Sequence, residues 1–236
     1  IQYEMTMRIL IVNKFLYLRG GDCVHSLNLK QLLRNAGHDV CFYAMSYSQN
    51  IVCEENKYFA EEISFSAKDL QGKIKAASRI IWGIGVVQNF KKLLEEFQPD
   101  VVHLNNIHSY LSPIVAKLAY QRGVKVIWTL HDYKLICPSY SCLCKGNTCE
   151  ACFTDKKHVV LRKCMKNSFP ASILAWGEAM NWNKNKLSLW TNSFICPSQF
   201  MAEKMQQGGY PASKLQVISN FIGEEQVQYI INTPNP

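Results

Sequence analysis

The amino-acid sequence predicts an α/β fold built on a doubly wound, Rossmann-like parallel sheet. Short continuous apolar runs alternate with longer amphipathic segments, and the 236 residues are 48% hydrophobic, which suffices for a sizeable core. Continuous apolar runs are typical of strands covered on both faces. Ligands of such sheets bind at the carboxyl ends of the strands, so candidate functional residues are those that directly follow each strand.

Residues 7–44 predict the first β-α-β unit. Residues 7–13 (MRILIVN) and 39–44 (DVCFYA) are apolar runs that we interpret as strands. Residues 22–35 between them carry leucines at near-helical spacing, and we expect Asp22 to cap this helix and Gly37 to end it.

The alternation of strands and helices continues along the chain. Residues 69–97 predict one long amphipathic helix or two helices broken at Gly83 and Gly85. Further helices are expected at 113–122, over much of the stretch up to residue 190, and from 198 onward. Further strands are expected at residues 101–104, 124–130, 193–196 and 215–219. The polar tail from residue 223 is typical of a linker.

Charge and composition restrict the classes of function. Lys and Arg number 26 against 18 Asp and Glu, a net charge of +8 that favours partners with phosphate groups or an anionic surface. The sequence shows neither an apolar run of about 18 residues nor a secretory signal pattern, which predicts a soluble, cytoplasmic protein. The ten cysteines are accordingly expected to be reduced.

Two glycines precede the first predicted helix. The backbone N–H groups after Gly20 and Gly21, together with the helix dipole, are suited to a phosphate group. The spacing matches neither the dinucleotide fingerprint nor the P-loop, and the simpler alternative is that the glycines only turn the chain.

Polar side chains follow the third and fourth predicted strands. His131 and Asp132 come after the run at 124–130, where an imidazole can bind a substrate hydroxyl, although Asp132 can equally cap the next turn. The group after the run at 101–104 suits hydroxyl recognition at the sheet edge, with capping or packing as the alternative. Its members are His103, Asn105, Asn106 and His108.

Several segments together resemble the N-terminal half of a family 4 glycosyltransferase, a retaining nucleotide-sugar enzyme of the two-domain type called GT-B. They occur in family order over almost the whole chain: MRILIVNKFLYLRGGD, GHDV, QPDVVHLNNIHSYLSP, KVIWTLHDYKLICP, FICPSQFMAEKMQQGG and KLQVISNFI. The resemblance implies that Gly20 and Gly21 approach the diphosphate of the donor and that His131 contacts the transferred sugar. It also implies that His103, Asn105, Asn106 and His108 border the acceptor side of the cleft. We expect Asp132 to bind substrate beside them. Cys23 stands where the family commonly has Glu.

The resemblance also implies a division of the chain. Residues 1–221 correspond to the acceptor-side domain and residues 222–236 to a linker toward an absent donor-binding domain, so this fragment is expected to be inactive alone. The whole enzyme would transfer a hexose-type sugar from a nucleotide-diphosphate sugar to a glycan or lipid-linked acceptor in cell-surface polysaccharide synthesis. No cofactor or metal is implied for catalysis.

Six of the ten cysteines lie between residues 137 and 164, and Cys149 and Cys152 have the C-x2-C spacing of zinc knuckles. One hypothesis is a structural zinc ion held by Cys137, Cys149, Cys152 and Cys164. The alternatives are reduced thiols that pack the loop, and disulfides formed during purification.

The segments 73–92 and 163–190 combine lysines with Trp82, Trp176, Trp182 and Trp190. They suit a peripheral contact with the inner face of an anionic membrane, but ordinary amphipathic helices with buried aromatic residues have the same pattern.

Two rival functions remain. One is a non-catalytic nucleotide- or glycan-binding module, and the other is a zinc-ribbon nucleic-acid binder, which is disfavoured because base-reading elements are absent.

Overall fold

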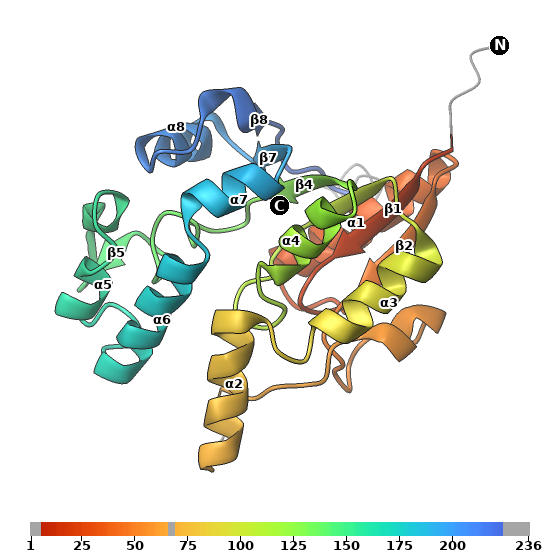
Figure 1. Ribbon diagram of the computed structural model, residues 1–236. Coiled ribbons are helices and arrows are strands. Elements are labelled where there is room, and N and C mark those ends of the chain that lie inside the picture. Colours follow the sequence, from red (N-terminus) through yellow and green to blue (C-terminus); the bar gives the residue numbers. More distant parts are fainter. Residues whose placement is uncertain (1–5, 66–68, 224–236) are drawn as a thin grey trace, which may run out of the picture.

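The computed structural model describes residues 6–65 and 69–223, and a six-stranded parallel sheet forms the centre of this part of the chain (Figure 1). The strand order is β2-β1-β3-β4-β7-β8, and every pairing within the sheet is parallel. The chain winds outward from β1 to β2 and then resumes on the other side of β1 with β3. The predicted doubly wound α/β fold is therefore confirmed, and its switch point lies between β1 and β3.

The sheet strands follow the predicted runs closely. They are β1 (Arg8–Val12), β2 (Asp39–Tyr43), β3 (Val101–Leu104), β4 (Lys125–Thr129), β7 (Ser193–Cys196) and β8 (Leu215–Val217). A small antiparallel pair, β5 (Leu143–Cys144) with β6 (Asn147–Thr148), lies in the cysteine-rich loop and was not predicted.

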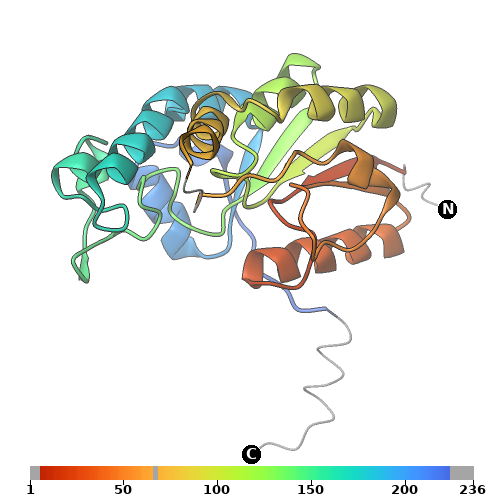
Figure 2. The ribbon, with the colours of Figure 1, turned by 90° about the horizontal axis from the view of Figure 1, so that it is seen from below.

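Helices cover both faces of the sheet. Figure 2 shows α1 on one face, with α3 and α4 on the other. The helices are α1 (Gly21–Asn35), α2 (Leu70–Trp82), α3 (Val87–Phe97), α4 (Ile114–Gln121), α5 (His158–Leu161), α6 (Phe169–Asn181), α7 (Lys184–Trp190) and α8 (Gln199–Gln207). Short 3-10 turns occur at Glu54–Tyr58, Ala151–Phe153 and Ala212–Lys214.

The first helix begins one residue earlier than its sequence predicts. Gly20 is the N-cap residue and makes no side-chain capping bond, so the expected cap by Asp22 is wrong. Asp22 lies in the first turn, where its carboxylate Oδ2 is 3.4 Å from Lys14 Nζ. Gly37 follows the C-cap residue with φ +84°, a left-handed conformation that glycine adopts without strain, as expected for the end of this helix.

The break between α2 and α3 lies at the predicted glycines. Gly83 caps α2 with φ +72°, and a Cβ atom there would lie 2.4 Å from Ile114 Cγ2. Gly85 has φ +84°, and its Cβ would lie 2.6 Å from Arg79 Nη2. The two glycines thus permit both the turn and the close approach of α4 and Arg79.

Arg79 is fully buried and binds only backbone carbonyl groups in the described part of the chain. Its Nε donates to Ile84 O at 2.6 Å, and Nη1 donates to Tyr110 O at 3.0 Å. Nη1 and Nη2 also donate to Glu61 O, at 3.3 and 3.2 Å. One guanidinium group therefore fixes three loop segments to α2.

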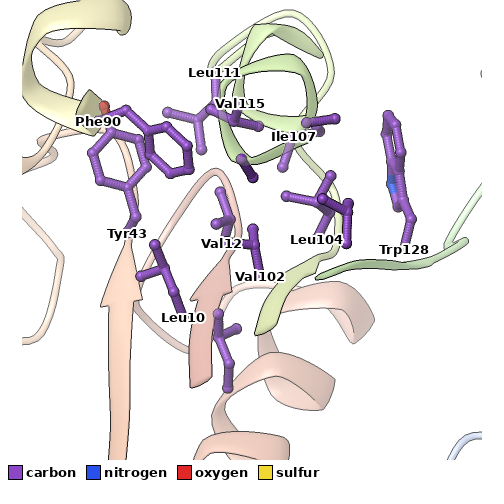
Figure 3. Close-up of a cluster of buried hydrophobic side chains, with 14 of the residues drawn as sticks. Leu10, Val12, Tyr43, Phe90, Val102, Leu104, Ile107, Leu111, Val115 and Trp128 are labelled. Atoms are coloured by element: carbon purple, nitrogen blue, oxygen red, sulfur yellow. The ribbon is translucent and has the colours of Figure 1, made fainter. Parts of the chain in front are cut away.

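The main core lies between the sheet and the helices α3 and α4 (Figure 3). Leu10 and Val12 of β1 and Val102 and Leu104 of β3 are fully buried there. Phe90 of α3 and the residues Leu111 and Val115 cover them, while the Tyr43 ring packs edge-on against Phe90 with the centroids 4.9 Å apart. This buried apolar layer holds the strand ends, and hence the polar residues after them, in fixed positions.

The chain returns to α1 after β8. The ring of Phe221 packs edge-on against His25 of α1, with centroids 5.3 Å apart. Most of the expected linker at 222–236 lies outside the described residues.

Candidate active site

Three neighbouring strands end at one edge of the sheet, and backbone bonds tie the segments that follow them together. Asn105 N donates to Val12 O at 2.9 Å, and Lys14 N donates to Asn106 O at 3.0 Å. The Asn13 side chain accepts from Asn106 N at 3.1 Å. The segments after β1 and β3 therefore form one rigid rim at the switch point of the sheet.

His131 follows β4 and is held by Asn105. Its Nε2 lies 3.0 Å from Asn105 Oδ1, and Asn105 O in turn accepts from the indole Nε1 of Trp128 at 3.0 Å. If Oδ1 is the acceptor, the hydrogen-bond network assigns the proton of His131 to Nε2 and leaves Nδ1 as an acceptor. Two predicted site residues, His131 and Asn105, are thus brought into direct contact.

Three imidazoles gather on this side of the rim. The ring of His25 in α1 lies 5.1 Å from the ring of His131, and His103 Nε2 is 2.8 Å from Thr129 Oγ1. Burial, and then the charge of His25, lower the pKa of His131 to about 4 and that of His103 to about 3. Burial also lowers the pKa of His25. All three rings are therefore neutral at pH 7 and bind as hydrogen-bonding groups.

The N-terminus of α1 lies beside this group. The first N–H groups of a helix have no partner within the helix, and here they follow Gly20 and Gly21. Neither glycine has a positive φ, and a Cβ on Gly21 would meet nothing within 4 Å. Backbone strain therefore does not account for the pair. Lys14 supplies a cation at this helix end, partly balanced by Asp22 at 3.4 Å.

Lys14 also lines a cavity of about 640 Å³. Asn106, His108 and Asp132 line it at the strand ends, and Tyr110 and Phe65 lie at its aromatic side. Ile80 of α2 and Ala171, Leu174 and Ala175 of α6 form an apolar wall.

Two of the predicted cleft residues in this cavity have shifted pKa values. His108 stacks on Trp128 with centroids 5.4 Å apart, and burial, followed by the charge of Lys134, lowers its pKa well below the usual range. Burial raises the pKa of Asp132, whose Oδ1 accepts from Lys134 N at 2.8 Å. His103 and Asn105 lie deeper and are not among the residues that line the cavity.

A buried ion pair, not predicted from the sequence, forms part of the cavity lining. Lys134 Nζ is 2.8 Å from Glu178 Oε2 and donates to Pro138 O at 2.8 Å.

Lys14 could have been predicted, because it follows β1 directly. His25 and Glu178 lie inside helices, where no local signal marks them as parts of a site.

The cysteines of the loop do not form the predicted zinc set. Cys137 interacts with the thiols of Cys142 and Cys152, which lower its pKa, whereas Cys164 interacts with Cys144. Arg162 Nη1 donates to Cys149 Sγ at 3.0 Å. Within residues 6–65 and 69–223, no group of three or more His, Cys, Asp or Glu side chains is arranged to hold a metal ion, and all ten thiols are free. The zinc hypothesis is therefore not supported.

Helices α2 and α6 pack side by side and expose apolar residues beside the cavity. On α6 these residues recur on one face: Phe169 (51% exposed), Ile173 (43%), Trp176 (38%) and Met180 (52%). On α2, Leu70, Ile74 and Trp82 are exposed. The other two tryptophans of the segments 73–92 and 163–190, Trp182 and Trp190, are buried, as the packing alternative predicted. Among the described helices, none is long and apolar enough to span a membrane.

Comparison with known proteins agrees with the fold. The model of Glycosyltransferase Family 4 matches residues 19–226. An uncharacterized glycosyltransferase of Methanosarcina acetivorans is 36% identical over 107 residues, which are 42% of this chain and 28% of that protein.

Solved structures with the same fold include the catalytic domain of starch synthase IV from Arabidopsis thaliana, bound to ADP and acarbose. It has a TM-score of 0.54 and 12% identity, over 94% of this chain and 53% of that one. MurG from Acinetobacter baumannii has a TM-score of 0.45 and 12% identity, over 92% of this chain and 46% of that one. The chain thus spans about a quarter of the curated relative and about half of these structures.

Proposed function

The chain belongs to glycosyltransferase family 4, and we propose that it is the acceptor-side domain of an enzyme that transfers a sugar from a nucleotide-diphosphate sugar, with retention, to a glycan or lipid-linked acceptor. One observation carries the proposal. Lys14 lies 3.4 Å from Asp22 at the N-terminus of α1 and also lines the cavity of about 640 Å³. A helix end suited to phosphate and a cavity with polar residues at the strand ends, suited to an acceptor, therefore share one residue, Lys14.

On the donor side, the first N–H groups of α1, after Gly20 and Gly21, would bind diphosphate oxygens. His131 would contact the transferred sugar. Because its pKa is about 4, it is neutral at pH 7, and Nδ1 can accept a hydrogen bond from a sugar hydroxyl. In this proposal His131 positions the donor and does not act as a nucleophile.

Transfer would proceed through an oxocarbenium-like transition state. Fixed hydrogen-bond donors stabilise the charge that develops on the departing diphosphate. The acceptor hydroxyl, presented from the cavity that Asn106, His108 and Asp132 line, attacks the anomeric carbon on the face from which the diphosphate departs. Its proton passes to a diphosphate oxygen. Retention of configuration follows from attack on that face.

The remaining parts of the donor site would come from a second domain. We infer that residues 1–221 are the acceptor-side domain, that 222–236 connect it to a donor-binding domain, and that this chain alone turns over no donor. The whole enzyme would act in cell-surface polysaccharide synthesis at the cytoplasmic face of the membrane.

The exposed face of α2 and α6 supports a peripheral membrane contact. Its apolar stripe lies beside the cavity, and lysines accompany it at Lys73, Lys75, Lys166 and Lys186. Such a face can dip into the headgroup region and bring a lipid-linked acceptor to the cavity. Vesicle flotation with and without phosphatidylglycerol tests it. Changing Trp82 and Trp176 to Ser should reduce binding, whereas Val217→Ser, on β8, should not.

The activity is tested with the full-length gene product and a panel of nucleotide sugars and glycosides. We expect transfer with the anomeric configuration of the donor retained, as read by NMR. Loss of one positioned hydrogen-bonding group typically lowers kcat by about 100- to 1,000-fold, so His131→Ala should lose activity on that scale. Binding of nucleotide sugar without turnover by any acceptor would instead favour a non-catalytic binding module.

A further inference from the structure

The buried ion pair between Lys134 and Glu178 has bonding capacity that the described residues do not use. Glu178 is only 4% exposed, and its Oε2 binds Lys134 Nζ at 2.8 Å. The other carboxylate oxygen, Oε1, is buried without a hydrogen-bond partner. Buried carboxylate oxygens are nearly always hydrogen-bonded, because leaving one unpaired forfeits its hydration without return. Something outside the described protein atoms is therefore expected to bind it.

The position of the pair indicates what that partner is. Lys134 and Glu178 line the same cavity as Asn106, His108 and Asp132, at the edge where the acceptor is expected. Lys134 also fixes this wall, because its Nζ donates to Pro138 O and its backbone N donates to Asp132 Oδ1, both at 2.8 Å. A partner in the cavity that donates a hydrogen bond to Glu178 must carry a hydroxyl or N–H group, and sugars are rich in hydroxyls.

The surrounding charges explain why a neutral donor fits better than an ion. The Lys134 ammonium already neutralises Glu178, so a cationic ligand would add an uncompensated charge and an anionic group would face the carboxylate. A hydroxyl supplies the missing proton without adding charge. Carboxylate-to-hydroxyl bonds are short and strong, and they discriminate well against ligands that lack the hydroxyl.

We propose that Glu178 is a specificity-determining residue that accepts a hydrogen bond at Oε1 from one hydroxyl of the acceptor sugar, with Lys134 holding the carboxylate in place. This inference rests on the proposed glycosyl transfer. It adds to it a residue of α6 that selects the acceptor by the presence of one hydroxyl group. The competing occupant is a water molecule, because a second cavity of about 20 Å³ touches the same two side chains and has room for one.

The test compares acceptors that lack one hydroxyl with enzymes that lack the pair. Octyl glycosides of glucose, galactose, mannose and N-acetylglucosamine, and then the mono-deoxy forms of the best one, are assayed for kcat/KM with the full-length gene product. The mono-deoxy form that lacks the reacting hydroxyl cannot be a substrate and is left out of the comparison. Among the other mono-deoxy forms, we expect the wild-type kcat/KM of one to be about 10- to 100-fold below that of the parent acceptor, the scale of one hydrogen bond to a charged group.

The ratio of kcat/KM for the parent acceptor to kcat/KM for that deoxy acceptor is then measured for three variants. The double variant Lys134→Met with Glu178→Leu removes both charges and leaves neither buried alone, so it should fold. In this double variant the kcat/KM ratio should fall to about one. In Glu178→Gln, which keeps a neutral hydrogen-bonding partner, it should fall to a few-fold. The matched control replaces Lys92 and Glu96, an exposed pair on α3 that does not line the cavity, by Met and Leu and should keep the wild-type ratio.

The outcomes are distinguishable. If the double variant is folded by circular dichroism and every deoxy acceptor keeps its wild-type ratio, Glu178 holds a water and the inference is overturned. If the wild-type enzyme transfers sugar neither to these glycosides nor to any other acceptor, the proposed function itself fails, and the inference fails with it. A loss of activity that is equal for parent and deoxy acceptors would mark a structural role only.

Discussion

Replacing Arg79 by Met should destabilise the fold strongly. Among residues 6–65 and 69–223, the guanidinium is the only hydrogen-bond donor to three loop carbonyls, those of Ile84, Glu61 and Tyr110, at 2.6 to 3.3 Å. Each buried acceptor left without a donor costs about 1 kcal/mol or more. With the lost packing of a fully buried side chain, we expect the free energy of unfolding to fall by about 3 to 5 kcal/mol.

Urea denaturation followed by far-ultraviolet circular dichroism measures this change. For a domain of this size the melting temperature should drop by roughly 2 to 4 °C per kcal/mol. Arg79→Lys keeps the charge but not the planar guanidinium group, so its free energy of unfolding should lie between those of Arg79→Met and wild type. Lys75→Met, one turn earlier on the exposed side of α2, should leave the midpoint unchanged. A loss below about 1 kcal/mol for Arg79→Met would refute the reasoning, because the carbonyls would then have found other partners.

Three further predictions concern backbone, pH and thiols. Gly85→Ala should cost about 1 to 2 kcal/mol from its left-handed φ of +84° and more from the 2.6 Å contact with Arg79, measured by the same denaturation assay. The free energy of unfolding should fall as the pH drops from about 6.5 toward 4, because folding lowers the pKa of four histidines and the unfolded chain therefore binds protons first. Each histidine adds up to about 1.4 kcal/mol per pH unit to the slope of stability against pH. A stability that does not change over this pH range would contradict the prediction. These histidines are His25, His103, His108 and His131. A thiol titration should find ten reactive groups after denaturation but clearly fewer in the native protein, where five cysteines are buried; ten fast groups in the native state would contradict the packing.

The fold could be predicted because its signals are local. The run from Arg8 to Val12 is apolar at every position after the first, and Gly83 and Gly85 mark the break between α2 and α3, where both glycines have positive φ values. The expected cap by Asp22 was wrong for a physical reason. Gly20 already has the extended conformation of an N-cap, and the Asp22 carboxylate instead faces the Lys14 ammonium.

The site could be predicted only in part. Residues that directly follow strands, such as Asn106 and Asp132, were found because parallel strands share one carboxyl edge. Glu178 was missed because its position on α6 faces the cavity only through the packing of α6 against α2, more than 90 residues earlier in the chain. The predicted zinc set is not supported, because sequence spacing does not specify which thiols meet. That pairing is decided by the path of the loop, which brings Cys142 to Cys137 and Arg162 to Cys149.

The position of Trp128 has a spectroscopic consequence. Its indole is 1% exposed, stacks between the His108 ring at 5.4 Å and the Phe194 ring at 6.1 Å, and donates to Asn105 O. His108 lines the cavity and Asn105 binds His131, so the indole of Trp128 contacts both a residue of the cavity and the residue that holds His131. Its emission should therefore shift when a ligand enters, which makes the chain its own optical sensor of occupancy without any attached label.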